Sequence, residues 1–280
     1  MIIKKRIPGI VIIVVIISIT GLLLSSCAPF QSFHNKDGWN AVIQSVKDGT
    51  YKEKYSIGDT LELDLGSEGI VEMQIVAFDA DELADGNGKA AITWISKQLL
   101  NSDHRMNPAR EDDPSDSSKY LIGTGSIGGW ANSEMRSWLQ SDVKALIPST
   151  VRNAIKPVRK YSTSYTTANP SSSESYIYNE STVDDVWIPS WQEVYGSDSG
   201  YSGWYERYES SGPTYALFDS YDDRVKQKTG ASRAPLWWLR SASSGNDDFN
   251  SYHFERVLSG GGNDASYADA PCAVALGFCI

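Results

Sequence analysis

The chain of 280 residues carries 35 acidic and 25 basic side chains, which gives a formal net charge of −10 at pH 7. This balance argues against nucleic-acid binding, which needs a positive footprint. It also argues against direct adhesion to anionic lipid. A chain of this length forms one large domain or two small ones.

The first 27 residues predict a secretory signal. Three basic residues at 4–6 precede an apolar run over 10–24, and Leu24-Ser25-Ser26-Cys27 follows. The cysteine resembles that of the lipobox of bacterial lipoproteins, which implies that Cys27 is lipidated and becomes the mature N-terminus. The alternative is an uncleaved anchor over 7–26, a stretch long enough to span a membrane. Either arrangement tethers the rest of the chain outside the cytoplasmic membrane.

Cleavage before Cys27 would change the charge further. It removes Lys4, Lys5 and Arg6 and no acidic residue, so 22 basic and 35 acidic side chains remain and the net charge becomes −13. We therefore expect the anchor alone to hold the protein at the membrane, with about 0.8 kcal/mol from each buried acyl methylene.

The N-terminal part of the mature chain predicts a helix and three strands after a short tether at 28–37. Trp39, Val42, Ile43 and Val46 share one face of a helix over 39–46. Alternating leucines predict a half-buried strand over 61–65, and two more strands are expected at 70–78 and 90–95.

An acidic loop over 81–89 lies between the last two of these strands. Asp79, Asp81 and Asp85 invite a calcium interpretation, but their spacing does not match that of a helix-loop-helix calcium site. Asp-Gly and Asn-Gly pairs are ordinary hairpin-turn residues, so we expect a turn. No cofactor is expected, and calcium has no support from the sequence.

The middle of the chain reads as loops and short helices. Residues 101–119 are polar and predict a surface loop. Gly123, Gly125 and Gly128 form a G-x-G-x-x-G pattern, which we interpret as a glycine-rich turn into a helix over 133–139, not a dinucleotide site, because no clear strand precedes it. A second short helix is expected at 148–154, followed by an exposed excursion over 161–183 that is rich in Ser, Thr, Tyr and Asn.

The C-terminal part predicts a strand at 186–188 that turns into a helix, and then strands at 236–241, 254–258 and 273–280. Strands at both ends with helices between them indicate an α+β fold whose terminal strands meet in one sheet. If 273–280 is one strand, Cys272 and Cys279 are too far apart for a disulfide, so we expect two buried or half-buried thiols. A redox or copper-binding pair and intermolecular pairing are the alternatives.

Several runs, taken in order, carry a family resemblance. TYKEKYSIGDT, DADELADGNGKAAITWISKQLL, GGWANSEMRSWL, VWIPSWQEVYG, LWWLRSAS and the terminal GFCI resemble a bacterial domain of unknown function, number 6273, found in surface proteins and lipoproteins. The resemblance covers about residues 50–280.

The order of the last motifs is also similar to the C-type-lectin-like fold of formylglycine-generating enzymes and their relatives. This resemblance implies one C-type-lectin-like domain with small antiparallel sheets and two or more helices over 38–280. For many relatives it implies a binding role, and it does not imply a reaction. The usual Arg-Pro before the final strand is replaced here by Ala275-Leu276.

The motif LWWLRSAS places Trp237 and Trp238 on opposite faces of a strand, with Arg240 on the side of Trp238. Arg240 would then give a cation–π or ion-pair support beneath the following loop. Because tryptophan is mostly buried, we expect a scaffold role for a set of five residues. They are Trp187, Trp191, Trp237, Trp238 and Arg240.

Three loops over 161–183, 196–213 and 241–270 are the expected contact surface. Their Tyr, Ser, Gly and Asn content is typical of binding loops, although a plain loop with a hairpin, or aromatic core filling, gives the same composition. The candidate ligand-binding residues are Tyr201, Trp204, Tyr205, Tyr208, Asn246, Asp248, Asn250, Tyr252, His253 and Arg256.

The last of these loops is also depleted in certain residue types. Lys, Glu, Gln, Met and Trp make 47 of the 280 residues, so about five are expected in thirty, yet residues 241–270 contain only Glu255. Adenine-directed mutagenesis leaves such a deficit, and lectin-fold proteins of this kind are sometimes targets of diversity-generating retroelements. Loop composition alone is the alternative explanation.

The function expected from these observations is a lipid-anchored extracellular protein that binds a glycan or a protein ligand. His34, His104 and His253 lie in no nucleophile motif, and Thr124 breaks the G-x-S-x-G pattern. No metal-ligand spacing appears. Catalysis is therefore not expected. The alternatives are an oxidase of the formylglycine-generating type that uses Cys272 and Cys279, and an envelope scaffold without a soluble ligand.

Overall fold

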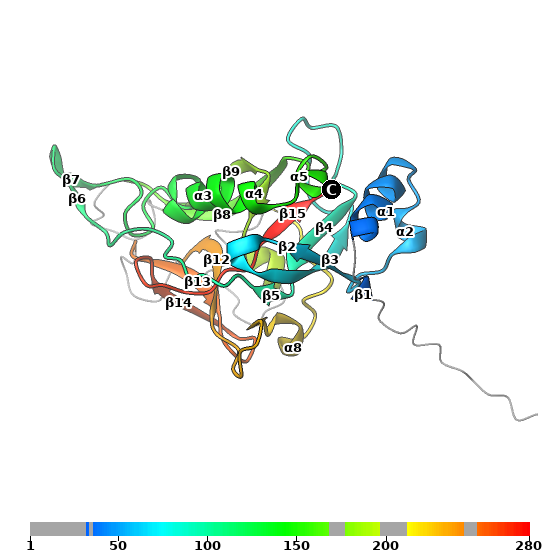
Figure 1. Cartoon of the computed structure of the whole chain (residues 1–280). Coiled ribbons are helices and arrows are strands. Elements are labelled where there is room, and N and C mark those ends of the chain that lie inside the picture. Colours follow the sequence, from blue (N-terminus) through cyan, green and yellow to red (C-terminus); the bar gives the residue numbers. More distant parts are fainter. Residues whose placement is uncertain (1–31, 34–35, 168–176, 197–211, 244–250) are drawn as a thin grey trace, which may run out of the picture. The chain divides into compact units, whose positions relative to one another are not determined.

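A computed structural model describes residues 32–33, 36–167, 177–196, 212–243 and 251–280 (Figure 1). Residues Gln31–Ile280 belong to one compact unit. Within the described ranges, no helix has both the length and the apolar character needed to cross a membrane.

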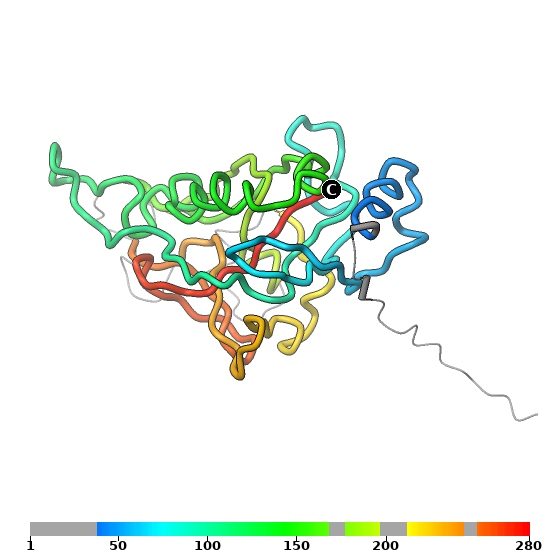
Figure 2. Tube along the Cα trace, in the orientation of Figure 1, coloured from blue at the N-terminus to red at the C-terminus, as the bar shows by residue number. Residues whose placement is uncertain are grey.

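A six-stranded sheet joins the two ends of this unit. Its strand order is β1 (Ser32–Phe33), β2 (Thr60–Asp64), β3 (Ile70–Phe78), β4 (Ile92–Ser96), β15 (Gly277–Cys279) and β10 (Val186–Trp187). β15 pairs antiparallel with β4, with Phe278 opposite Trp94, and with β10 on its other side. Figure 2 shows the red C-terminal segment running beside the cyan strands from the N-terminal half. The prediction that the terminal strands meet in one sheet is confirmed.

The N-terminal elements follow their sequence patterns closely. Helix α1 (Lys36–Lys47) buries Trp39 and Val42, and α2 (Tyr51–Lys54) follows it. The Trp39 ring lies 5.0 Å from that of Trp94 and 5.8 Å from that of Phe278, so α1 packs on the sheet. β2 buries Leu61 and Leu63, and the 3-10 helix η1 (Gly66–Glu68) connects it to β3.

The helical segment after the glycine-rich turn is longer than predicted. It comprises η2 (Trp130–Asn132), α3 (Glu134–Trp138), the π-helix η3 (Leu139–Val143) and α4 (Lys144–Leu146). The second helix, predicted over 148–154, is present as α5 (Ser149–Arg152). Ser133 caps α3 by accepting a hydrogen bond from the backbone N–H of Arg136. The buried side chains of Met135, Leu139 and Val143 recur at helical spacing, which explains why the helix continues past Leu139.

The prediction of an exposed loop over 161–183 is wrong for most of its described residues. Strands β8 (Val158–Tyr165) and β9 (Ile177–Asp184) form a long antiparallel hairpin. Thr163, Ser164 and Tyr165 are buried despite their polar groups. Hydroxyl-bearing residues suit both loops and strands, so composition misled the interpretation.

A three-stranded sheet contains β12 (Trp237–Ala242), β13 (His253–Val257) and β14 (Asn263–Tyr267). β5 (Gln98–Leu99) pairs in parallel with β11 (Gln227–Lys228). Two short helices complete the description, α6 (Trp191–Tyr195) and α8 (Tyr221–Arg224). The predicted surface loop over 101–119 instead contains the hairpin β6 (Asp112–Asp113)–β7 (Asp116–Tyr120), and its residues Met106 and Asn107 are buried.

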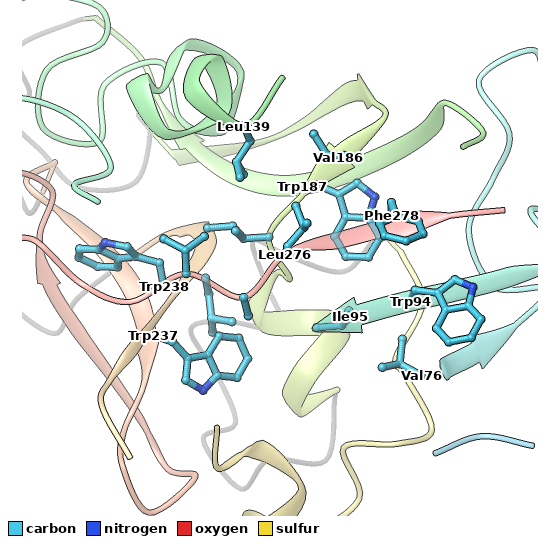
Figure 3. Packing of buried hydrophobic residues seen from close by; sticks show 14 of the residues in the cluster. Val76, Trp94, Ile95, Leu139, Val186, Trp187, Trp237, Trp238, Leu276 and Phe278 are labelled. Atoms are coloured by element: carbon cyan, nitrogen blue, oxygen red, sulfur yellow. The ribbon is translucent and has the colours of Figure 1, made fainter. Parts of the chain in front are cut away.

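The core is rich in tryptophan, and Trp94, Trp187, Trp237 and Trp238 lie within it (Figure 3). Cys272 and Cys279 are both free and buried, as predicted. The final strand is shorter than predicted, because only 277–279 pair as β15. The fold class is α+β, with helices and several small sheets around one core.

Candidate functional site

A buried ionic network connects the motifs WIPSWQEV and LWWLRSAS. The guanidinium of Arg240 donates from Nη1 and Nη2 to the two carboxylate oxygens of Glu193, at 2.6 and 2.7 Å. It also donates to the backbone oxygens of Ile188 and Tyr161. Glu193 in turn accepts from the backbone N–H of Ser190 and completes a capping box at the start of α6.

The network extends to a second cation and a second carboxylate. Nζ of Lys160 donates to Glu193 at 2.8 Å, to Asp81 at 2.6 Å and to the hydroxyl of Tyr215 at 2.6 Å. The same ammonium lies 3.4 Å from the ring centroid of Trp187. All four charged side chains are at most 1% exposed. Two cations balance two carboxylates, which is the condition under which buried charges persist.

This network alters the protonation of its members. Burial raises the pKa of Glu193, but the positive charges of Arg240 and Lys160 outweigh that effect and hold the pKa at about 2. Burial, together with the charges of Asp81 and Glu193, holds the pKa of Tyr215 well above its usual value. Glu193 is therefore ionised at neutral pH, and the phenol of Tyr215 beside it is neutral.

The network fixes β12, and β12 fixes the hairpin beyond it. Thr163 Oγ1 donates to the backbone oxygen of Ala242 at 2.6 Å, and the hydroxyl of Tyr165 donates to that of Ser243 at 2.7 Å. The backbone N–H of Ser243 donates to the backbone oxygen of His253 at the start of β13. The β13–β14 hairpin is thus anchored to β8 through buried hydrogen bonds.

An aromatic surface at this anchored end is the candidate functional site. We call it the arginine–tyrosine cluster, and it comprises Arg110, Tyr120, Tyr252, His253 and Tyr267. The guanidinium carbon of Arg110 lies 4.1 Å from the ring centroid of Tyr120 and 3.5 Å from that of Tyr252. The rings of His253 and Tyr267, which are cross-strand partners, lie 4.3 Å apart. Tyr252 contacts both of those rings edge-on.

Hydrogen bonds hold the cluster in one arrangement. Arg110 donates to Ser251 Oγ at 2.7 Å and to the hydroxyl of Tyr252. Tyr120 is 8% exposed, whereas Tyr267 is 59% exposed and presents its ring to solvent. The cluster therefore offers one open aromatic surface on a fixed support.

The cluster adds little free positive charge to the surface. Burial lowers the pKa of His253, and the nearby Arg256 lowers it further against the opposing effect of Asp264, so the imidazole is neutral at pH 7. Arg256 forms an ion pair with its cross-strand partner Asp264 at 2.7 Å. Arg110 is covered by the two rings.

The glycine-rich turn supports this cluster through its close approach to Ser251. Gly125 has φ +52°, and a Cβ there would lie 2.4 Å from the backbone oxygen of Ser251 and 2.8 Å from Cβ of Arg110. The backbone N–H of the next residue, Ser126, donates to that same oxygen of Ser251. Only glycine permits this approach.

The predicted site residues divide into described and undescribed sets. Tyr252 and His253 belong to the cluster, and Arg256 lies beside it on β13. The five scaffold candidates Trp187, Trp191, Trp237, Trp238 and Arg240 are all at most 1% exposed. Other candidates lie outside the described residues, namely Cys27, Tyr201, Trp204, Tyr205, Tyr208, Asn246, Asp248 and Asn250.

Two details differ from the sequence interpretation of this region. Arg240 forms the ion-pair alternative, with Glu193, and the ring that lies 6.0 Å from it is that of Trp187, whereas the sequence pattern suggested Trp238. Asp81 is buried on Lys160, although the hairpin turn after it, closed by a bridge between Glu82 and Lys89, is as predicted. Among the described residues no group of three or more His, Cys, Asp or Glu side chains is arranged to hold a metal ion.

Sequence reasoning missed Arg110, which lies in the segment 101–119 expected to be a surface loop, and Tyr120, which directly follows that segment. The hydrogen-bond partners of Arg110 are 141 and 142 residues away in the chain, so no local pattern indicates them. Tyr267 lies within the expected binding loop 241–270, but its pairing with His253 depends on the hairpin register.

The two thiols lie in unlike surroundings. Cys272 donates to the backbone oxygen of Leu236, whereas Cys279 lies 3.5 Å from a carboxylate oxygen of Asp81 and 3.6 Å from Thr93 Oγ1. Burial raises the pKa of Cys272 to about 11 and that of Cys279 well above its usual value. Both thiols are protonated at neutral pH, which makes them weak nucleophiles.

Comparison with known proteins identifies the family. The model of a domain of unknown function, DUF6273, matches residues 111–280, which is more than half of the chain. The chain belongs to this family. The match includes Tyr120 and the whole β12–β13–β14 sheet and begins one residue after Arg110. No curated protein and no solved structure matches the chain.

Proposed function

We propose that this DUF6273 protein is a lipid-anchored extracellular receptor that binds an uncharged carbohydrate on the arginine–tyrosine cluster. The observation that carries the proposal is the ring of Tyr267, which is 59% exposed and packed against His253 and Tyr252. An aromatic face held by its neighbours gives a large contact area at a low cost in conformational entropy.

The charge of the site supports an uncharged ligand. Arg256 is paired with Asp264, Arg110 is stacked between two rings, and His253 is neutral at pH 7. Within the cluster an acidic ligand would meet the guanidinium of Arg110 only beside the rings of Tyr120 and Tyr252, and it would be repelled by the acidic protein. Hydroxyl groups of a sugar can instead pair with the polar groups of Asp264 and Tyr252.

The anchor and the lectin-like relationship are parts of the same proposal. The run Leu24-Ser25-Ser26-Cys27 supports lipidation at Cys27, and the sheet begins only a few residues later, at Ser32 in β1. The mixed helices and small antiparallel sheets fit the C-type-lectin-like fold that the motif order implies. The buried, protonated thiols favour this binding role over the oxidase alternative.

The test is binding of the purified full chain, in detergent micelles, to an array of neutral and acidic glycans with calcium or a chelator. We expect a neutral glycan to bind and Tyr267→Ala to weaken that binding about tenfold, equivalent to about 1.4 kcal/mol. The matched control is Tyr221→Ala, because Tyr221 is similarly exposed at 62% and lies against Gly261, outside the cluster.

Three results would contradict the proposal. An equal loss of glycan binding in Tyr267→Ala and Tyr221→Ala would show that the cluster is not the binding site. Exclusive binding of acidic glycans would contradict the charge argument. A blank array, followed by cross-linking of a protein partner at Tyr267 on intact cells, would replace the carbohydrate by a protein ligand.

A further inference from the structure

The protein buries two lysines in opposite ways. Lys160 is paired with Asp81 and Glu193 and donates to Tyr215. Lys226 is also buried, at 3% exposure, but it has no ion pair in the part of the chain that the structure describes. Its Nζ donates to one backbone oxygen, that of Ser96, at 2.6 Å.

The surroundings of Lys226 are apolar on one side. Its Nζ lies 5.6 Å from the ring centroids of both Phe218 and Trp237. Burying an ammonium ion is costly unless an opposite charge pairs with it. Two aromatic rings and one carbonyl oxygen compensate that cost only partly. The neutral amine is therefore favoured at this position.

A cavity of about 170 Å³ lies beside the Lys226 side chain. Lys226 lines it, together with Gln74, Lys97, Leu217, Asp222, Asp223 and Val225. It lies where β3, the end of β4 and helix α8 meet, and it is separate from the arginine–tyrosine cluster. Its volume suits a compound of a few carbon atoms.

The charges around the cavity reinforce the neutral state of the amine. Burial, and then the positive charge of Lys97, lower the pKa of Lys226 to about 7. Lys97 is itself paired with Glu72 on β3 at 3.2 Å. Asp222 and Asp223 face the cavity from α8, where Asp223 also caps the helix by accepting from Ser220. A desolvated lysine beside another cation is a recognised form of activated amine nucleophile.

We propose that Lys226 is a carbonyl-reactive lysine that forms an imine with a small aldehyde entering this cavity. The lone pair of Nζ attacks the carbonyl carbon, and the carbonyl electron pair moves to oxygen. A proton passes from nitrogen to that oxygen to give a carbinolamine. Loss of water then forms the C=N bond, with Asp222 or Asp223 exchanging the protons, and no oxidant or reductant takes part.

The test is reductive trapping on the full chain in detergent micelles, with acetaldehyde as the probe and cyanoborohydride as the trapping reductant. Modified lysines are identified by peptide mass spectrometry over pH 5 to 10. We expect Lys226 to be labelled at pH 7 at least about tenfold faster than the exposed Lys47 and Lys52, because half of its amine is neutral when the pH equals its pKa. The rate should rise with a midpoint near pH 7.

Two controls separate reactivity from access and folding. Lys160 is equally buried but ion-paired, so it should stay unlabelled in the folded protein. Leu217→Trp fills the cavity and leaves the lysine in place, so it should abolish labelling of Lys226 without changing the circular dichroism spectrum.

Labelling of Lys226 no faster than that of Lys47, or a midpoint near pH 10, would overturn the proposal. Unchanged labelling in a folded Leu217→Trp protein would overturn the role of the cavity. Carbohydrate binding does not involve these residues, so either outcome leaves the proposed receptor function untouched.

Discussion

Arg240 and Glu193 join the two tryptophan-rich motifs of the protein through a pair of parallel hydrogen bonds, at 2.6 and 2.7 Å, inside the core. Glu193 also accepts a hydrogen bond at the start of α6, and Arg240 donates to the backbone oxygens of Tyr161 and Ile188. A bidentate pair in a dry environment is stronger and more directional than a surface ion pair.

Removing one partner of this pair should be costly. We expect Arg240→Met to lower the free energy of unfolding by about 3 to 5 kcal/mol, because it leaves a buried carboxylate with one fewer cation. The double variant Arg240→Met/Glu193→Gln should lose less than the sum of the single variants. Urea denaturation of all four proteins measures this, and simple additivity would show that the two side chains do not interact.

Acid should destabilise the fold through Glu193. Its folded pKa of about 2 lies below the unfolded value, so its ionisation stabilises the fold at pH above about 4.3. That contribution, about 3 kcal/mol for a shift of roughly two pKa units, is lost as the pH falls from 4.3 toward 2. Thermal denaturation between pH 2 and 7 should show this loss, and Glu193→Gln should reduce the slope. An identical slope in wild type and variant would contradict the assignment.

Glu180 on β9 should give a pH dependence of stability opposite to that of Glu193. It is half-buried and accepts a hydrogen bond from the backbone N–H of Ala131, and burial raises its pKa to about 7. The folded state then holds a proton that the unfolded state releases, so stability falls as the pH rises from about 4.3 to 7. Glu180→Gln should stabilise the protein at pH 8 by on the order of 2 kcal/mol, after allowance for partial solvent exposure. Thermal denaturation of both proteins at pH 5 and pH 8 measures this difference. A Glu180→Gln protein that is no more stable than the wild type at pH 8 would contradict the prediction.

The glycine-rich turn should not tolerate a side chain at Gly125. Gly125→Ala places a Cβ against the backbone of Ser251 and should cost more than the roughly 1 kcal/mol expected for a positive φ alone. It should also weaken carbohydrate binding, because Ser251 holds Arg110. The matched control is Gly86→Ala, where φ is +73° and nothing lies within 4 Å of the new atom. Equal denaturation midpoints for the two variants would contradict the close approach.

The thiols should be inert in the folded protein. Burial raises the pKa values of Cys272 and Cys279, so neither forms the reactive thiolate near neutral pH. Peptides that contain these cysteines should remain unalkylated by iodoacetamide at pH 8 and become alkylated in urea. Rapid alkylation without urea would reopen the oxidase alternative.

Periodicity in the sequence determined the elements that depend on local patterns. The alternating leucines of β2, the apolar run of β3 and the helical face of Trp39 each predict the observed element, because burial of one face requires that spacing. Strands at both chain ends likewise predict the shared sheet in which β15 lies beside β4.

Only the tertiary structure decided where polar and charged side chains go. Thr163 and Tyr165 become core residues because Ala242 and Ser243, about 78 positions away, accept their hydrogen bonds. Lys160 is buried because Asp81 and Glu193 reach it from distant segments, whereas Lys226 is buried with no carboxylate partner among the described residues. A single sequence records which groups can pair but not which are brought together, and that choice is made by packing across the whole chain.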